Sequence, residues 1–332
     1  MTARSLSVLL VALATEGCAS GPTDGTPNGP DPLPVGDHEF GLTVAGRSRF
    51  YIVRIPPAAI SGAPLPVVLA LHGGGGNPEQ FKEDSDFDPV ADREGFIVAY
   101  PAGNGTVLTP RTLLTWNAGI DCCGTALTQG INDVEFLLAV LDHLAARTPV
   151  EVDRVYAAGH SNGAMMAYRL AAEAANRVAA IVPVAGAMQL ATFAPSRPVP
   201  VLHIHSVDDP RALYEGGLGP PFPLGGGQVF HQPVMEGIES WLDRNGCPAN
   251  PQVVAELEGE FGTVNEGHTA AKLVWATCTS GAPVIHWRMT GAGHGWPGRI
   301  LSPAREELVG GSTTLLSAPE EAWDFLEEFR LP

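Results

Sequence analysis

Apolar residues follow two different patterns along this chain. Continuous apolar runs, typical of strands buried on both faces of a sheet, lie at residues 67–71, 96–100, 154–158, 181–185, 201–205 and 284–289. Between them, apolar residues recur every three or four positions, which predicts helices at 132–146, 164–175, 235–245 and 320–329. Because buried strands alternate with helices, we expect an α/β fold in a single domain, with a mostly parallel central sheet and helices on both of its faces.

The beginning of the chain has a different character. Arg4 precedes an apolar run at residues 6–14, as in a secretory signal peptide, and this run is too short to span a bilayer. A Gly-Cys pair follows, so either Cys18 is lipidated, as in bacterial lipoproteins, or the chain is cleaved near Ala19 without lipidation. We predict a secreted or extracytoplasmic protein, with or without a lipid anchor at a bacterial membrane. It consists of a signal peptide (1–17), a flexible tether rich in Gly and Pro (18–36) and a globular domain (37–332).

The composition argues against one class of binding partner, nucleic acids. The chain of 332 residues has 36 Asp and Glu against 19 Lys and Arg, a formal net charge of −17. Nucleic-acid binding requires clustered basic side chains that contact phosphates, so we expect no nucleic-acid partner. The 39 glycines and 30 prolines have no three-residue period, which indicates many loops rather than collagen. We expect a monomer.

Four cysteines remain after Cys18, and in an exported protein an even number favours disulfides. Adjacent cysteines bond each other only with strain, so we predict a bond between Cys247 and Cys278. Cys122 and Cys123 either form a vicinal bridge or stay free. The spacing typical of zinc sites, Cys-x-x-Cys, does not occur, so we expect no metal.

A Gly-His-Ser-Asn-Gly sequence at 159–163 lies between a predicted strand and a predicted helix. This context is typical of the nucleophile elbow, in which a tight turn lifts a serine hydroxyl above the sheet. The two glycines are needed because a Cβ atom would clash with the strained backbone of the turn. We predict that Ser161 is a catalytic nucleophile; the alternative is a glycine-rich turn with an incidental serine.

A serine hydroxyl needs a base that takes its proton. His294 is the best candidate because it lies in a glycine-rich loop just after the predicted strand at 284–289. Other histidines fall within strand patterns and are interpreted as core residues: His203, His205 and His286. A further group lies in polar surroundings and is interpreted as surface residues: His38, His143, His231 and His268.

The base needs an acidic partner to fix its tautomer. Asp208 and Asp209 follow the predicted strand at 201–205. The chain order serine, aspartate, histidine is that of the α/β-hydrolase fold. The residues alone leave the choice between the two carboxylates open, and the other one would cap the turn.

An oxyanion hole completes this chemistry. The glycines at 73–76 follow an early strand, where the α/β-hydrolase fold supplies one backbone N–H, and the residue after the nucleophile supplies the other. We assign these donors to Gly74 and Asn162. A phosphate loop is excluded because Gly-Lys-Ser/Thr is absent. A dinucleotide loop is excluded because Asn77 and Pro78 interrupt the glycine pattern.

Taken together, these residues resemble the secreted esterase family that includes polyhydroxybutyrate depolymerases, feruloyl esterases and acetylxylan esterases. The resemblance extends from about residue 40 to 298 and rests on motifs at 72–74, 96–101, 116–119, 122–124, 132–136, 154–156, 159–163 and 293–298. Members place the acid after a His-Gly-x-x-Asp pattern, which corresponds to 205–209 and selects Asp209, with Ser206 in place of the usual glycine. The resemblance implies that residues 37–332 form an α/β-hydrolase catalytic domain, that esters are hydrolysed through an acyl-enzyme, and that no metal or organic cofactor is used.

Several residues are predicted to line the substrate cleft: His72, Trp116, His160 and Trp296. Trp116 presents an aromatic face to the cleft unless it is a buried anchor. The segment at 216–233 has no periodicity and is predicted to form a substrate rim or lid. Asp133 starts a predicted helix and is interpreted as a capping or packing residue.

We therefore expect a secreted serine esterase. Its substrate is either a polyhydroxyalkanoate-type polyester or oligomer, or a feruloyl or acetyl ester of plant polysaccharide. One alternative is a serine peptidase of the same fold, which normally carries a propeller or cap domain for which this chain has no room. Another is a non-catalytic binding module on a hydrolase scaffold, which the intact Ser161, Asp209 and His294 argue against.

Overall fold

The computed structural model describes residues 32–106, 108–222 and 227–332. The predicted signal peptide and most of the predicted tether lie outside these residues. The last part of the tether, residues 33–36, contacts the domain: the Leu33 backbone donates to Thr148 Oγ1 (3.3 Å), and its side chain packs against the core.

The described residues form one large mixed sheet of ten strands, in the order β1-β2-β4-β3-β5-β6-β7-β12-β11-β10. Six central strands are parallel to one another. They are β3 (Leu65–Leu71), β4 (Ile97–Pro101), β5 (Val150–His160), β6 (Ala180–Val184), β7 (Val201–Ser206) and β12 (Val284–Thr290). These are the six strands predicted from the continuous apolar runs, and the α/β-hydrolase architecture is confirmed.

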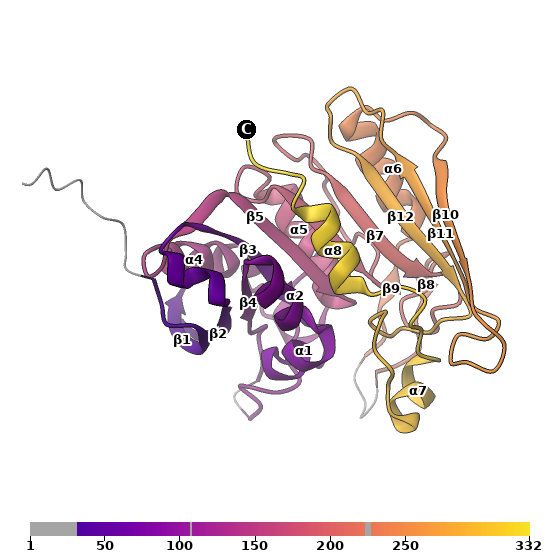
Figure 1. Cartoon of the computed structure of the whole chain (residues 1–332). Helices are drawn as coiled ribbons and strands as arrows, with labels where there is room; N and C mark the ends of the chain where they lie inside the picture. Colours follow the sequence, from indigo (N-terminus) through magenta and orange to yellow (C-terminus); the bar gives the residue numbers. More distant parts are fainter. Residues whose placement is uncertain (1–31, 107, 223–226) are drawn as a thin grey trace, which may run out of the picture.

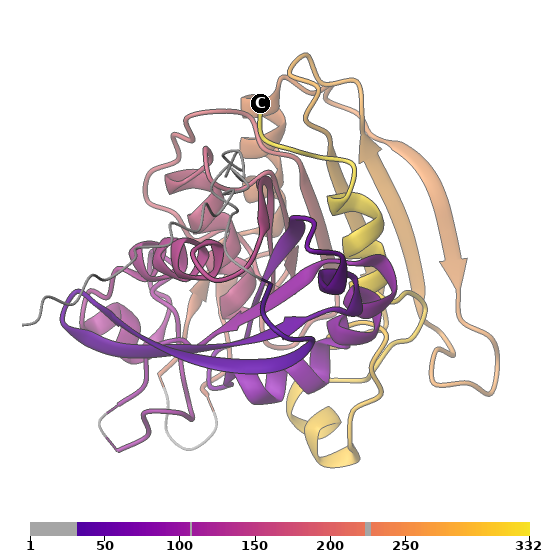
Figure 2. The same cartoon turned by 60° about the vertical axis from the view of Figure 1, so that its left-hand side comes forward.

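Antiparallel strands extend the sheet at both ends (Figures 1 and 2). One end carries β1 (Gly36–Val44) and β2 (Arg47–Ile55), and the other carries β11 (Thr269–Trp275) and β10 (Gln252–Glu258). None of these four strands was predicted from the sequence. In β1 and in most of β2 more and less buried positions alternate, because one face of each strand is less covered than the other. β10 and β11 are only partly buried along their length.

Helices cover both faces of the sheet (Figure 1). Alternate residues of β3 point to opposite faces: Leu69 joins the core cluster with α4 (Asp133–Ala145), α5 (Asn162–Glu173) and α6 (Val234–Asn245). Val68 joins the cluster with α1 (Pro78–Ser85), α2 (Phe87–Glu94) and α8 (Ala318–Leu326). Helix α8 ends three residues before the predicted end at 329. The remaining elements are short: η1 (Pro57–Ser61), α3 (Gly124–Thr128), β8 (Gly217–Leu218), β9 (Phe230–His231) and α7 (Pro303–Val309).

Buried polar contacts and crosslinks tie the layers together. Arg49 on β2 pairs with the buried Asp133 at the start of α4 (2.8 Å), and Asp133 also accepts from the Asn117 backbone (2.8 Å), so this carboxylate is a packing residue. Disulfides join Cys247 to Cys278 and Cys122 to Cys123.

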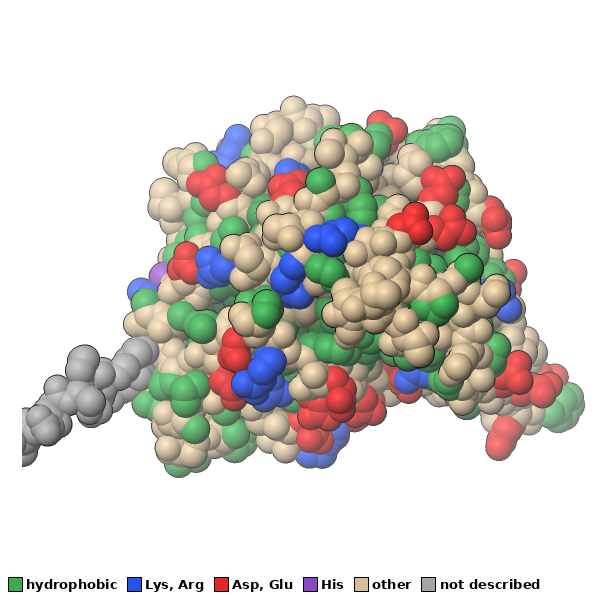
Figure 3. All heavy atoms as spheres, turned by 90° about the horizontal axis from the view of Figure 1, so that it is seen from above, with side chains coloured by type: hydrophobic (Ala, Val, Ile, Leu, Met, Phe, Trp, Pro, Cys, Tyr) green, Lys and Arg blue, Asp and Glu red, His purple; other side chains and the backbone are tan. Residues whose placement is uncertain are grey.

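Two further properties concern the exterior. On the face shown in Figure 3, Lys and Arg side chains are scattered among Asp and Glu. Within the described residues, no helix combines the length and the apolar character needed to cross a bilayer.

Candidate active site

Ser161 occupies the turn between β5 and α5. Its backbone has φ +55°, a region that non-glycine residues rarely adopt, and its N–H donates to Val184 O on β6 (2.8 Å). A Cβ atom on Gly159 would overlap the Gly163 carbonyl, and one on Gly163 would overlap the Leu71 carbonyl of β3. Both glycines are therefore required for the turn to pack against the sheet.

The predicted acid, base and nucleophile lie in one hydrogen-bonded row. His294 Nε2 is 2.8 Å from Ser161 Oγ, and His294 Nδ1 is 2.7 Å from Asp209 Oδ2. Since the carboxylate only accepts, Nδ1 carries the hydrogen and Nε2 is free to accept from the serine. The arrangement has the geometry of a Ser-His-Asp triad.

The two adjacent carboxylates have different environments. Asp209 is buried, and its Oδ1 accepts from the backbone of Arg211 (2.7 Å) and Ala212 (2.9 Å). Burial alone would raise the pKa of Asp209, but the charge of His294 and hydrogen bonds from His205 and His294 outweigh it and hold that pKa well below its usual range. Asp208 is exposed and accepts from the Gly291 backbone (2.7 Å), so it braces the loop that carries the base.

Ser206, which replaces the glycine usual in the family, has a clear structural role. Its Oγ donates to Ala292 O (2.6 Å) and accepts from the Asp208 backbone (3.3 Å). The side chain thereby connects the loop that carries Asp209 (the acid loop) to the loop that carries His294 (the base loop). The backbone N–H of His294 also anchors the base loop, through a hydrogen bond to Val309 O (2.5 Å).

The two amides assigned to the oxyanion hole lie beside each other. A Cβ atom on Gly74 would be 3.4 Å from Asn162 Cβ. Among the described residues, no acceptor pairs with the N–H of Gly74 or of Asn162, whereas Gly75 N–H donates to Leu114 O (2.8 Å). The Asn162 side chain is fixed by two bonds to the Trp116 backbone (2.7 and 3.1 Å).

Trp116 and His72 support this loop from behind. Trp116 is fully buried, donates from Nε1 to His72 O (2.9 Å), and lines neither cavity described below. It is the buried anchor rather than an exposed face of the cleft. His72 accepts from Gly103 N–H (2.9 Å), and burial lowers its pKa to about 4. The ring is therefore neutral at pH 7.

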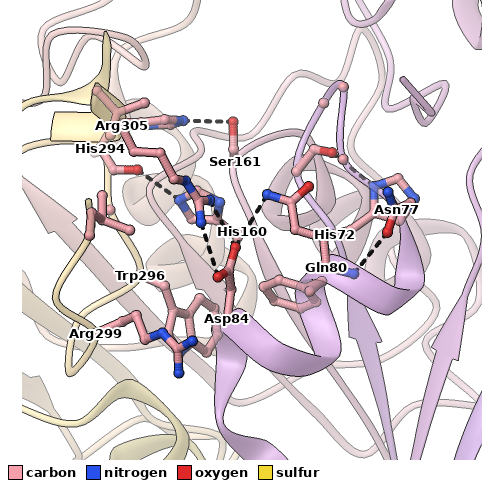
Figure 4. A pocket seen from close by; sticks show the side chains of 18 residues that line it. His72, Asn77, Gln80, Asp84, His160, Ser161, His294, Trp296, Arg299 and Arg305 are labelled. Atoms are coloured by element: carbon pink, nitrogen blue, oxygen red, sulfur yellow. Dashed lines mark hydrogen bonds and ion pairs between the residues drawn. The ribbon is translucent and has the colours of Figure 1, made fainter. Parts of the chain in front are cut away.

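Two cavities meet at Ser161 and His294. The first, of about 210 Å³, lies toward α1 and α7 and is lined by His72, His160 and Trp296, which were predicted there (Figure 4). Across this cavity, Arg305 on α7 forms a paired ion contact with Asp84 on α1 (3.0 and 2.8 Å). His160 donates from Nε2 to His294 O (2.9 Å), and burial lowers its pKa to about 3.

The second cavity, of about 190 Å³, lies toward the segment after β7 and is mostly apolar. Pro220, Phe222, Val229 and His231 of the predicted rim line it, together with Leu308 and Val309 of α7. The described parts of the predicted rim, 216–222 and 227–233, thus lie at the site and contain the β8–β9 pair, while residues 223–226 lie outside the described residues.

Two histidines that were predicted to lie on the surface are buried, His231 and His268. His231 lies in the wall of the second cavity, and burial lowers its pKa to about 4. His268 packs against Gly291 at the start of the loop that carries His294. Both are buried by contacts with segments distant in sequence, which their polar local sequence does not reveal. Helix α7 was missed because none of its residues is buried, so its sequence shows no apolar periodicity.

The chain is similar to known esterases. Residues 49–219 match the family profile described as Esterase PHB depolymerase. A protein of Nocardia uniformis subsp. tsuyamanensis, provisionally named as the esterase NocK, is 32% identical over 86% of this chain and 81% of its own length. The bifunctional acetylxylan esterase/xylanase XynS20E of Neocallimastix patriciarum is 24% identical over 80% of this chain, which spans only 31% of that protein.

Structural similarity supports the same fold. The acetyl xylan esterase of Aspergillus awamori superposes with a TM-score of 0.51 at 15% identity, covering 82% of this chain and 97% of that one. The family profile and the similarity to NocK identify this chain as a member of the Esterase PHB depolymerase family of carboxylic ester hydrolases.

Proposed function

We propose that this protein is an exported serine esterase in which Ser161, His294 and Asp209 form the catalytic triad. The observation that carries the proposal is the row of hydrogen bonds from Ser161 Oγ through His294 to Asp209, located where two cavities meet. A bound ester can then place its acyl and alcohol parts in different cavities, with the carbonyl carbon beside Ser161.

The reaction follows from the hydrogen-bond directions. Ser161 Oγ attacks the carbonyl carbon while its proton passes to His294 Nε2, and Asp209 stabilises the resulting imidazolium. The negative oxygen accepts from the N–H groups of Gly74 and Asn162. His294 then gives its proton to the leaving alcohol, and a water molecule activated by the same histidine releases the acid from Ser161.

The cavities favour substrates larger than acetate. A cavity of about 150 Å³ accommodates benzene, so the apolar cavity of about 190 Å³ is large enough for a substituted aromatic ring or a short hydroxyalkanoate unit. An acetyl group fills only a small part of this volume. We therefore rank feruloyl-type esters and hydroxyalkanoate oligomers above acetylated polysaccharide.

Export is also part of the proposal. The signal-like N-terminus and the Cys247–Cys278 bond support an extracytoplasmic location, where disulfides persist. Lipidation at Cys18 would hold the enzyme at a membrane, and mass spectrometry of the mature N-terminus distinguishes a lipidated Cys18 from a chain cleaved near Ala19.

A fluorophosphonate probe tests the mechanism, because it reacts only with an activated serine. We expect labelling of the wild type and none of Ser161→Ala. Equal labelling of both, or none of either, would refute the proposal and favour a non-catalytic module. A panel of methyl ferulate, hydroxybutyrate oligomer, acetylated xylan and a peptide amide then ranks the substrates; preferred cleavage of the amide would favour the peptidase.

A further inference from the structure

A second row of buried side chains leads from Asp209 to the helix that begins at the nucleophile. Tyr168 on α5 lies 2.9 Å from His203 Nδ1, and His203 Nε2 lies 3.1 Å from His205 Nδ1. His205 Nε2 lies 2.9 Å from Ala212 O and 3.3 Å from Asp209 Oδ2. Tyr168, His203 and His205 are all buried, and the triad mechanism as described uses none of them.

The direction of every bond in this row follows from one fixed end. Ala212 O only accepts, so His205 carries a hydrogen on Nε2, and the Nδ1 of its neutral ring is an acceptor. His203 then donates from Nε2, which leaves its own Nδ1 to accept from the Tyr168 hydroxyl. A proton added to either ring would turn the buried Tyr168 hydroxyl from a donor into an acceptor and so deprive its hydrogen of this partner.

The burial of these side chains also favours their neutral forms. Burial lowers the pKa of His203 well below its usual range and raises that of Tyr168, so both are neutral at pH 7. Asp209 Oδ2 lies within reach of two rings, His205 and His294, of which only His294 contacts the nucleophile. A charged His205 would compete with His294 for the same carboxylate oxygen.

We propose that Tyr168, His203 and His205 form a positioning relay that keeps His205 neutral and reserves the Asp209 carboxylate for His294. This inference rests on the proposed triad. None of the three residues touches the substrate; they act through Asp209.

Other groups surround the relay. Tyr214 bonds to His286 Nε2 (2.9 Å), and His286 Nδ1 donates to His203 O (3.1 Å), which forms a side branch that does not lead to Asp209. The titratable and charged groups facing the relay from neighbouring elements are Asp209, Tyr214, Glu215, His231, His286, Arg288 and His294.

The side branch provides a matched control. Tyr168→Phe and Tyr214→Phe each remove one buried hydroxyl from a histidine, but only Tyr168→Phe frees a nitrogen of the relay. That nitrogen can then bind a proton without depriving a buried hydroxyl of its acceptor, so we expect His203 to be protonated at a higher pH than in the wild type. We expect kcat/KM of Tyr168→Phe relative to wild type to fall about tenfold or more between pH 8 and pH 5, and that of Tyr214→Phe to stay constant.

Three outcomes would overturn the relay while leaving the triad intact. In the first, the kcat/KM of Tyr168→Phe relative to wild type does not change between pH 8 and pH 5. In the second, Tyr168→Phe and Tyr214→Phe change alike over this range. In both cases Ser161→Ala is inactive, so the triad still holds. The third needs no variant: imidazole ¹⁵N NMR of the wild type would find His203 or His205 protonated at pH 6, or with the hydrogen on Nδ1. An active Ser161→Ala would instead refute the proposed function.

Discussion

Asp208 and Asp209 offer a sharp test because they are adjacent carboxylates in unlike surroundings. In Asp209→Asn the amide oxygen keeps the two backbone N–H groups of Arg211 and Ala212. The NH₂ group must then take the place of Oδ2 and face His294 Nδ1, which is itself a donor. Two donors cannot pair, so His294 shifts its hydrogen to Nε2 and can no longer accept the proton of Ser161.

The expected loss follows from this wrong tautomer. In a serine hydrolase with that tautomer kcat falls about 10⁴-fold, which corresponds to about 5.5 kcal/mol of barrier. Asp208→Asn keeps an oxygen for the Gly291 N–H and changes only an exposed group, so we expect kcat within about threefold of wild type, less than 1 kcal/mol.

The assay is hydrolysis of a p-nitrophenyl ester at pH 8, with thermal unfolding of each variant to establish that it is folded. The kcat ratio of the two variants is the decisive quantity. A larger loss in Asp208→Asn than in Asp209→Asn, with both folded, would show that the acid has been assigned to the wrong carboxylate.

Further predictions concern stability and substrate size. Arg49→Met leaves the buried Asp133 unpaired and should lower the free energy of unfolding by about 3–5 kcal/mol; a loss below 1 kcal/mol in urea would contradict this. Val229→Phe narrows the apolar cavity and should lower kcat/KM about tenfold more for methyl ferulate than for p-nitrophenyl acetate, whereas equal losses would mean that this cavity does not hold the larger group. Burial lowers the pKa of His160 and of His286 to about 3, below the unfolded value of 6.5, so the unfolded chain binds more protons between these values. Stability should therefore fall as the pH decreases from 6.5 toward 3, and a urea midpoint that is constant over this range would refute the buried, neutral state.

How far the sequence predicts this structure depends on how each segment is buried. The six parallel strands have apolar residues on both faces, and that pattern is visible without any tertiary information. Strands such as β1 and β10 have one face exposed to solvent, so they carry no continuous buried pattern from which their place in the sheet can be predicted.

The residues of the site also differ in how far local sequence reveals them. Ser161 and His294 each follow a predicted strand, so local sequence was enough to nominate them, whereas the choice of Asp209 over Asp208 came from the family resemblance. Trp116 lies in a loop and His231 in the two-residue strand β9, and only the packing of distant segments determines that both are buried. Loop sequence carries no periodic signal from which that packing can be inferred.

The position of β12 beside β7 has a consequence for how such enzymes can be altered. Met289 is paired with Ser206, so the loops that carry acid and base start from neighbouring strands. The chain between them forms the rim of the second cavity, α6 and the β10–β11 pair, which continues the sheet on the far side of β12. Because β10 lies at the edge of the sheet, a change there leaves the pairing of β7 with β12, and with it the separation of Asp209 and His294, in place, which makes this edge the natural place for grafting new modules onto the catalytic domain.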